Sequence, residues 1–388
     1  MTKNNDTVGN LGEKKLIEMI ITQSKLSQKE YYQKNPNNSQ IGDDSALIDL
    51  GDKYLVLSTD MLLESKHFLD EMTYFQKGFK SITVNVSDIA AMGAISIYVL
   101  ISIALPKDLP LVDFNYFLDG IFEACSFYNI NLIGGDTNES DELIISPTII
   151  GTTENKNVLM QNSFNDKDLI AITGEIGLSA IGYEIVSYDK DIEKTKEYLI
   201  SKGIDESFID LAISKIFSPI AKFKEGLLLN QSNCITAATD ISDGLASELY
   251  QLMKSSKDYD SYNDSNNNSN SNSNSNSNSN SNSNSNSNSN SNDLGFVIYE
   301  NSIPYLETIK NTAILLNKDY LDLLFNFGED FELLFTINHE KVEDFKEFFK
   351  DNSYFIVGTV NRSGKVQLIK SNGEIAEIKN KGYEHFKN

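Results

Sequence analysis

The sequence predicts an α+β protein of two domains, with an N-terminal half of α/β type. Strand-like and helix-like segments alternate along most of the chain, but they do not repeat as regular βαβ units. The length of 388 residues suits two domains, since domains mostly run to roughly 100–200 residues. The composition shifts at residues 154–168, so we place the domain boundary after residue 153.

The N-terminal half, residues 1–153, is expected to combine strands with two helices. Phe79, Ile82, Val86 and Ile89 recur at helical spacing, which indicates an amphipathic helix. The segments expected in this half are strands at 43–49 and 54–59, a helix at 74–92, a strand at 95–105, a helix at 112–128, and strands at 130–133 and 143–152.

The C-terminal half, residues 154–388, is expected to be an α+β domain. Its expected segments are a strand at 169–173, helices at 178–187 and 219–229, a strand running into Asp240, a helix from Leu245, and strands at 331–337, 355–360 and 366–369. Residues 262–292 are almost pure Asn and Ser, and they have no apolar surface to offset the entropy of ordering. We therefore predict a disordered insertion at about 258–293; a segment for assembly is the alternative.

The bulk composition excludes several classes of function. A formal net charge of −23 leaves no basic surface for nucleic acid or for an anionic membrane. Cys125 and Cys234 are far apart, which argues against a disulfide framework or a zinc site. We find no signal peptide and no apolar run of about 20 residues, so we expect a cytoplasmic protein.

Aspartates recur beside Gly, Ser or Thr in five short motifs. The motifs are Ile41-Gly42-Asp43-Asp44, Ser58-Thr59-Asp60, Asn85-Val86-Ser87-Asp88, Gly134-Gly135-Asp136-Thr137 and Thr239-Asp240-Ile241-Ser242-Asp243-Gly244. Single carboxylates backed by hydroxyls suit Mg²⁺, which prefers hard oxygen ligands. One Asp in a Gly-rich turn is more often a helix cap or an Asx-turn.

Asp88 differs from the aspartates of the other four motifs because it falls inside a predicted helix, three residues after Asn85. The neighbouring residues Ala90, Ala91 and Gly93 are small, so this helix is expected to be packed. A buried carboxylate needs a partner or a metal.

Taken in order, the five motifs resemble those of the thiamine-monophosphate kinase family. A more distant resemblance is to its superfamily, which includes aminoimidazole ribonucleotide synthetase and selenophosphate synthetase. The resemblance runs from Gly12-Glu13 to the ending Lys381-Gly382-Tyr383-Glu384-His385-Phe386 and leaves out only the Asn/Ser tract.

The resemblance implies a role for each matching residue. The implied metal ligands, for several Mg²⁺ ions, are Asp44, Ser58, Thr59, Asp60, Asp88, Asp136, Asp240 and Asp243. Gly135, Asp136 and Ser242 match residues that contact ATP, and Gly135 and Asp136 are expected in a turn. His67, Glu329 and Tyr383 match residues of the thiamine monophosphate site. Among these, Asp60, Asp88, Asp136 and Asp240 are the implied catalytic residues.

The resemblance also implies a fold and an activity. The N-terminal sheet would dimerise into a barrel-like core, and the C-terminal domain would close over ATP. The γ-phosphoryl group would pass directly to thiamine monophosphate, and the absence of a GxxxxGK[ST] loop is consistent with metal ions replacing its lysine.

Three departures leave alternatives open. Phe327-Gly328-Glu329-Asp330 stands where the family often has Gly-Gly-Glu-Asp, Gly177-Leu178-Ser179 replaces a Gly-Asp-Ser turn, and Gln161 occupies an expected basic position. The alternatives are another ATP-dependent enzyme of the superfamily, or a catalytically silent homologue that binds nucleotide.

Overall fold

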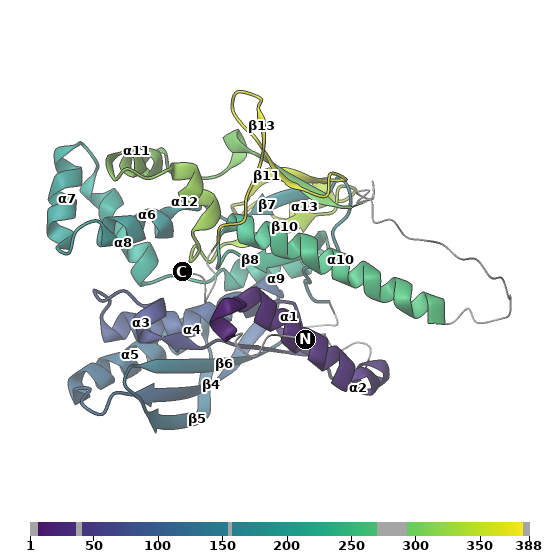
Figure 1. Ribbon diagram of the computed structural model, residues 1–388, viewed down its shortest axis with the longest axis horizontal. Coiled ribbons are helices and arrows are strands. Elements are labelled where there is room, and N and C mark those ends of the chain that lie inside the picture. The colour runs from purple at the N-terminus through teal and green to yellow at the C-terminus, as the bar shows by residue number, and fades with distance from the viewer. Residues whose placement is uncertain (1–6, 36–40, 154–156, 270–292, 383–388) are drawn as a thin grey trace.

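The computed structural model describes residues 7–35, 41–153, 157–269 and 293–382 of the chain. Each half contains one β-sheet, and helices lie around and between the two sheets (Figure 1). None of the helices within these residues combines the length and apolarity needed to cross a bilayer.

The N-terminal sheet has six strands in the order β1-β2-β6-β4-β5, with the short β3 paired to β6. Only β4 and β5 run parallel; the other pairs are antiparallel. The strands are β1 (Ala46–Asp49), β2 (Tyr54–Thr59), β3 (Leu62–Leu63), β4 (Ile95–Leu105), β5 (Asn131–Glu139) and β6 (Ile144–Thr152). Helices α1 (Glu13–Ser27) and α2 (Lys29–Lys34) precede the sheet.

Two long helices cover one face of this sheet. Helix α4 (Tyr74–Ala91) starts at a capping box in which Thr73 and Gln76 exchange side-chain and backbone hydrogen bonds. Helix α5 (Leu111–Tyr128) packs along α4, and a short helix, α3 (Glu64–His67), lies before them. Ile82, Val86 and Ile89 are fully buried, as their helical spacing predicts.

The C-terminal sheet has seven strands in the order β13-β12-β9-β11-β7-β10-β8, with only β12 and β9 parallel. The strands are β7 (Leu169–Ile172), β8 (Ile235–Asp240), β9 (Gly295–Tyr299), β10 (Leu333–Ile337), β11 (Phe355–Asn361), β12 (Val366–Ile369) and β13 (Ile375–Glu377). The helices are α6 (Leu178–Ser187), α7 (Ile192–Ser201), α8 (Glu206–Phe217), α9 (Phe223–Ser232), α10 (Leu245–Ser269), α11 (Glu307–Leu315), α12 (Tyr320–Asn326) and α13 (Val342–Phe348).

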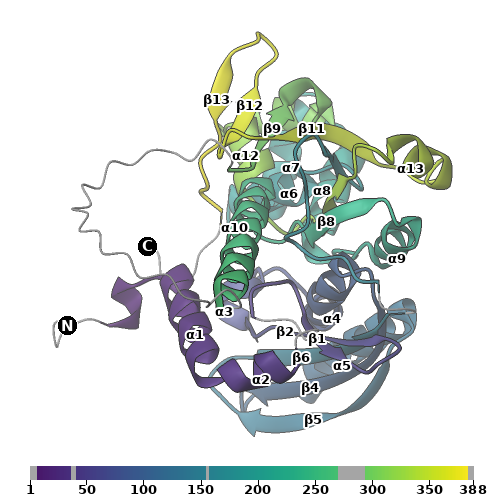
Figure 2. The same ribbon diagram turned by 90° about the vertical axis from the view of Figure 1, so that its right-hand side faces the viewer.

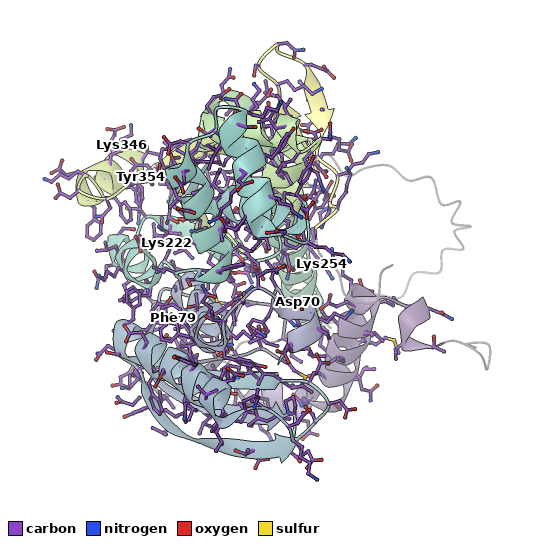
Figure 3. The ribbon with its side chains drawn as sticks, turned by 90° about the vertical axis from the view of Figure 1, so that its left-hand side faces the viewer. Asp70, Phe79, Lys222, Lys254, Lys346 and Tyr354 are labelled. Atoms are coloured by element: carbon purple, nitrogen blue, oxygen red, sulfur yellow. The ribbon has the colours of Figure 1, made fainter. Side chains whose placement is uncertain are left out.

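Helix α4 lies between the two halves and packs on both (Figures 1 and 2). Its apolar residues share one core cluster with Ile216, Phe217 and Ala221 of the C-terminal half. Tyr128 belongs to this core, and its ring lies 6.1 Å from that of Phe79 and 5.3 Å from that of Phe223. Figure 3 labels Phe79 of α4 and Lys222, the residue that precedes α9.

The structure corrects two sequence predictions. Gly135 and Asp136 lie within strand β5 and not in a turn, because β5 continues its parallel pairing with β4 through residue 139. Residues 258–269, expected at the start of the disordered insertion, belong to α10. No glycine or proline interrupts residues 245–269, so nothing in the sequence stops the helix there. The rest of the predicted insertion, 270–292, lies outside the described residues.

The close contact of α4 with α5 predicts a sensitivity to added methyl groups. A Cβ at Gly78 would lie 2.2 Å from the backbone oxygen of Phe117. Although alanine favours a helix over glycine, we expect Gly78→Ala to lower the free energy of unfolding by about 1–3 kcal/mol through overpacking. Chemical denaturation measures this. Glu123→Ala, on the exposed side of α5, is the control, and equal stability of the two variants would contradict the prediction.

Candidate functional site

The middle of helix α4 presents polar side chains to the end of strand β2. The Ser58 hydroxyl donates hydrogen bonds to the Asp88 carboxylate and to Oδ1 of Asn85, the latter at 3.2 Å. Asn85 is fully buried, and its Nδ2 has no hydrogen-bond partner among the described residues. The helix is packed, as its small residues predict, and it brings Asp88 to the end of β2, which Asp60 follows.

Strand β8 of the other half ends against the same stretch of α4. Its last residue, Asp240, is 2% exposed and accepts a hydrogen bond from the Ser87 hydroxyl at 2.6 Å. The Ser242 hydroxyl donates to the other carboxylate oxygen at 3.3 Å. Asp240 thus joins the two halves through the hydrogen bond from Ser87, while its other oxygen is bound by Ser242 of its own half.

Asp44 enters this region from the segment before β1. Its Oδ1 accepts hydrogen bonds from Nε2 of Gln161 at 2.7 Å and from the Thr239 hydroxyl at 3.0 Å. The backbone amide of Gln161 donates to Asp43 at 3.2 Å, and Ser255 donates to the Gln161 side-chain oxygen. Gln161 is buried, and its amide is used within the protein.

The carboxylates of this region act on one another electrostatically. We call them the acidic cluster: Asp43, Asp44, Asp60, Asp88, Asp240, Asp243 and Glu248. Burial raises the pKa of Asp43 and of Asp240 to about 6.

The remaining shifts in the cluster have the same direction. Burial, and then the charges of Asp60 and Asp240, raises the pKa of Asp88 well above its usual range. Burial, and then Asp43 and Asp240, does the same for Asp44, and burial followed by Asp243 does so for Glu248. Asp60 is more open to solvent, yet desolvation by its neighbours raises its pKa as well.

The carboxylate oxygens of the acidic cluster are suitable ligands for a hard divalent cation that also binds a substrate phosphate. Oδ2 of Asp44 is buried and has no hydrogen-bond partner, so the cluster contains a carboxylate oxygen with unused capacity. Across the described residues no three His, Cys, Asp or Glu side chains form a preformed metal site. Mg²⁺ does not require one, since it commonly takes one or two carboxylates and completes its shell with water and substrate phosphates.

A second group of side chains lies further along α4, towards its N-terminus. The Lys80 ammonium contacts both carboxylate oxygens of Glu329, at 2.7 and 2.8 Å, and the backbone oxygen of His67 at 3.0 Å. The His67 ring accepts the Leu63 backbone amide at Nδ1, at 2.9 Å. The structure thus brings together His67 and Glu329, two of the residues that the sequence analysis assigned to the acceptor site.

Comparisons with known proteins bear on the family. Residues 42–153 match the family model described as AIR synthase related protein, N-terminal domain. A thiamine-monophosphate kinase of Buchnera aphidicola subsp. Schizaphis graminum is 32% identical over 365 residues, covering 92% of this chain and 96% of the relative. The chain belongs to the thiamine-monophosphate kinase family.

Other relatives agree with this assignment. A thiamine-monophosphate kinase of Pyrococcus abyssi is 27% identical, covering 95% of this chain and 97% of the relative. A solved structure described as AaThiL complexed with AMPPCP and TMP superposes with a TM-score of 0.72 at 25% identity, covering 99% of this chain and all of that one. As a member of this kinase family, the chain is a phosphotransferase, and the predicted family and α+β fold class are confirmed.

Some residues expected in a site of this kinase family lie apart from the acidic cluster. Asp136 is exposed on the edge strand β5, opposite Ser102 of β4, which in turn pairs with Ser146 of β6. Neighbouring strands are about 4.8 Å apart, so Asp136 lies roughly 10 Å from Ser146, whose hydroxyl bonds to the Asp60 backbone. The Thr59 hydroxyl bonds to the Pro147 oxygen and does not share the partners of Ser58.

The last expected residue of the acceptor site, Tyr383, lies outside the described residues. The segment leading to it is described. The Lys381 amide donates to the Asn326 side chain at 3.0 Å, and Gly382 lies against Asp243 and Ser247. The chain thus approaches the acidic cluster just before this position.

Several residues of the site were not predicted from the sequence. Asp43 and Glu248 belong to the acidic cluster, and Lys80 binds Glu329. The carboxylate of Glu248 accepts a hydrogen bond from the Asp243 amide at 3.0 Å. Glu248 lies only five residues after Asp243 in the sequence, and this short spacing was a signal that could have placed it in the site. Lys80 gave no local signal, because its partner is 249 residues away.

The raised pKa values predict how stability depends on pH without divalent cations. Folded Asp43 and Asp240 keep their protons up to about pH 6, whereas an unfolded Asp releases its proton near 3.8. Protonation therefore favours the folded state at low pH, and this advantage is lost as the pH rises through 6. The shift of Asp240 corresponds to up to about 3 kcal/mol.

We expect Asp240→Asn, which cannot ionise, to lose less stability than the wild type between pH 4 and pH 7.5. Thermal unfolding in EDTA across this range measures the difference. Asp119→Asn, on the exposed side of α5, should follow the wild type. Parallel curves for Asp240→Asn and the wild type would contradict the prediction.

Proposed function

We propose that this member of the thiamine-monophosphate kinase family transfers the γ-phosphoryl group of ATP to the phosphate of thiamine monophosphate. The products are thiamine diphosphate and ADP. The acidic cluster is the observation that carries the proposal. It brings together carboxylates from both halves, and Oδ2 of Asp44 among them has no hydrogen-bond partner. The relative described as AaThiL complexed with AMPPCP and TMP supports the choice of the two substrates.

Several Mg²⁺ ions would be held by residues of the cluster. The proposed ligands are Asp44, Ser58, Thr59, Asp60, Asp88, Asp136, Asp240 and Asp243; the Thr59 hydroxyl bonds to the Pro147 oxygen, and Asp136 lies on the exposed strand β5. When bound, the cation supplies the positive charge that offsets carboxylates and phosphates. Gly135, Asp136 and Ser242 are the proposed ATP contacts.

The transfer requires positioning more than acid–base chemistry. An oxygen of the acceptor phosphate forms the new bond to the γ-phosphorus, while the bond between that phosphorus and the bridging oxygen of ADP breaks. A phosphate monoester has a second pKa of about 6, so the acceptor oxygen is ionised at neutral pH and needs no general base. We propose that His67, Glu329 and Tyr383 orient the acceptor.

We also propose that residues 1–153 form the ATP-binding and dimerisation domain, that residues 154–388 form the second domain, and that two copies associate through the N-terminal sheet. The face of this sheet away from α4 and α5 carries exposed apolar residues, including Tyr98 and Leu100 of β4, exposed by 42% and 38%. Strand β5 is exposed along its length. An open edge next to an apolar face is suited to a subunit contact.

A direct assay tests the activity. Purified protein, ATP, Mg²⁺ and thiamine monophosphate should give thiamine diphosphate, measured by chromatography, and EDTA should abolish it. We expect Asp60→Asn to lower kcat by about 100-fold or more, because a charge-stabilising group is lost. Asp119→Asn, on the exposed side of α5, should retain full activity.

Near-normal kcat in Asp60→Asn would refute the assignment of Asp60. Nucleotide binding without product would favour the silent homologue, a reading that Gln161 first suggested. Product with a different phosphate acceptor would favour another enzyme of the superfamily.

The proposed dimer has its own test. Leu100→Lys places a charge on the outer face of the sheet and should shift the sedimentation coefficient from dimer to monomer. Phe348→Lys, at a 46% exposed position on α13, should leave the mass unchanged. A monomeric wild type at micromolar concentration would exclude the proposal.

A further inference from the structure

The ammonium group of Lys80 is completely used within the protein. It has three N–H donors, and three oxygens lie within 3.0 Å: both carboxylate oxygens of Glu329 and the His67 backbone oxygen. The Lys80 side chain is 3% exposed, and that of Glu329 is 30% exposed. Lys80 therefore joins, through one buried charge, two residues of the proposed acceptor site that come from different halves of the chain.

The loop that carries Glu329 has a backbone that needs external support. Glu329 has φ of +62° and Phe331 has φ of +49°, values that side chains other than glycine rarely adopt. Such conformations persist where the surroundings hold them in place. The Lys80–Glu329 ion pair is a contact of this kind, made from the opposite half.

The same loop rests on the turn that follows β8. The Glu329 amide donates to the Ser242 oxygen at 2.9 Å, and the Phe331 amide donates to the Ile241 oxygen at 3.0 Å. A Cβ at position 328 would lie 1.8 Å from the Ser242 oxygen, so glycine is required for this approach. The loop is therefore held from one side by the turn after β8 and from the other by Lys80.

We propose that Lys80 is a positioning residue of the acceptor site, which holds the Glu329 carboxylate and the loop 327–331 in place. This inference rests on the proposed function for its kinetic consequence, but not for its structural one. Because its three donors are satisfied by the protein, Lys80 acts through Glu329 and His67 and does not bind the acceptor itself. Without Lys80, Glu329 would remain as a partly buried, unpaired charge.

Lys77 provides a matched control. It lies one turn earlier on α4, has a buried side chain like that of Lys80 (7% and 3% exposed), and pairs with Glu64 at 2.6 Å. Glu64 belongs to the same half as Lys77, so this pair does not join the halves. Lys80→Met and Lys77→Met therefore remove the same charge from the same helix, and only the first removes the support of loop 327–331.

Two measurements distinguish the variants. Hydrogen exchange is followed by mass spectrometry without substrate. The 327–331 amides should exchange roughly tenfold faster in Lys80→Met than in the wild type, and at the wild-type rate in Lys77→Met. In steady-state kinetics, Lys80→Met should raise the KM for thiamine monophosphate about tenfold with the KM for ATP within twofold. If Lys80→Met does not fold, Glu329→Gln removes the same ion pair and should give the same exchange pattern.

Unchanged exchange in loop 327–331, or equal changes in the two lysine variants, would overturn the proposal. An unchanged KM for thiamine monophosphate beside faster loop exchange would overturn its kinetic part. If the wild type does not phosphorylate thiamine monophosphate, the proposed function fails, and the exchange experiment still decides the role of Lys80.

Discussion

The arrangement depends on one helix, α4, which is buried between the two halves and yet carries polar and charged side chains. Lys80, Asn85 and Ser87 are buried and Asp88 is half-buried, so these groups are not hydrated as they would be on a surface helix. Buried polar groups need partners, and those of α4 find them in both halves: Ser58 on one side, Asp240 and Glu329 on the other. The acidic cluster and the proposed acceptor site are thus two places along the same helix.

Periodic segments were predicted well from the sequence. The helices at 74–92, 112–128 and 178–187 occur within one residue of their expected ends, because their apolar residues repeat at helical spacing and pack on a core. Helices α7 and α8 were not anticipated. Strand β5 was expected to stop before Gly134, since glycines usually interrupt strands, but pairing with β4 carries it through residue 139. Tertiary pairing prevailed over local preference.

Some residues of the candidate site were predicted from the sequence and others were not. Asp88 stood out because small neighbours indicated burial, and Asp240 because it ends a strand; both lie in the acidic cluster. Lys80 and Gln161 were missed as partners because their contacts cross between segments far apart in the chain. The structure also gives a physical reason for Gln161 at the position where a basic residue was expected. Gln161 is buried and bound to Asp44, so this position belongs to the interior of the cluster.

The shared position of α4 has a consequence for how the protein folds. By chain order the halves are separate, but α4 contributes to a core that includes Ile216, Phe217 and Ala221, and Ala91 joins another core with Leu229 and Phe335. Removing either half would leave buried charges and apolar side chains of the other in water. The two halves therefore make a single cooperative unit, in which unfolding of one removes the basis of the other, and a fragment cut near residue 153 would not be an autonomous folding domain.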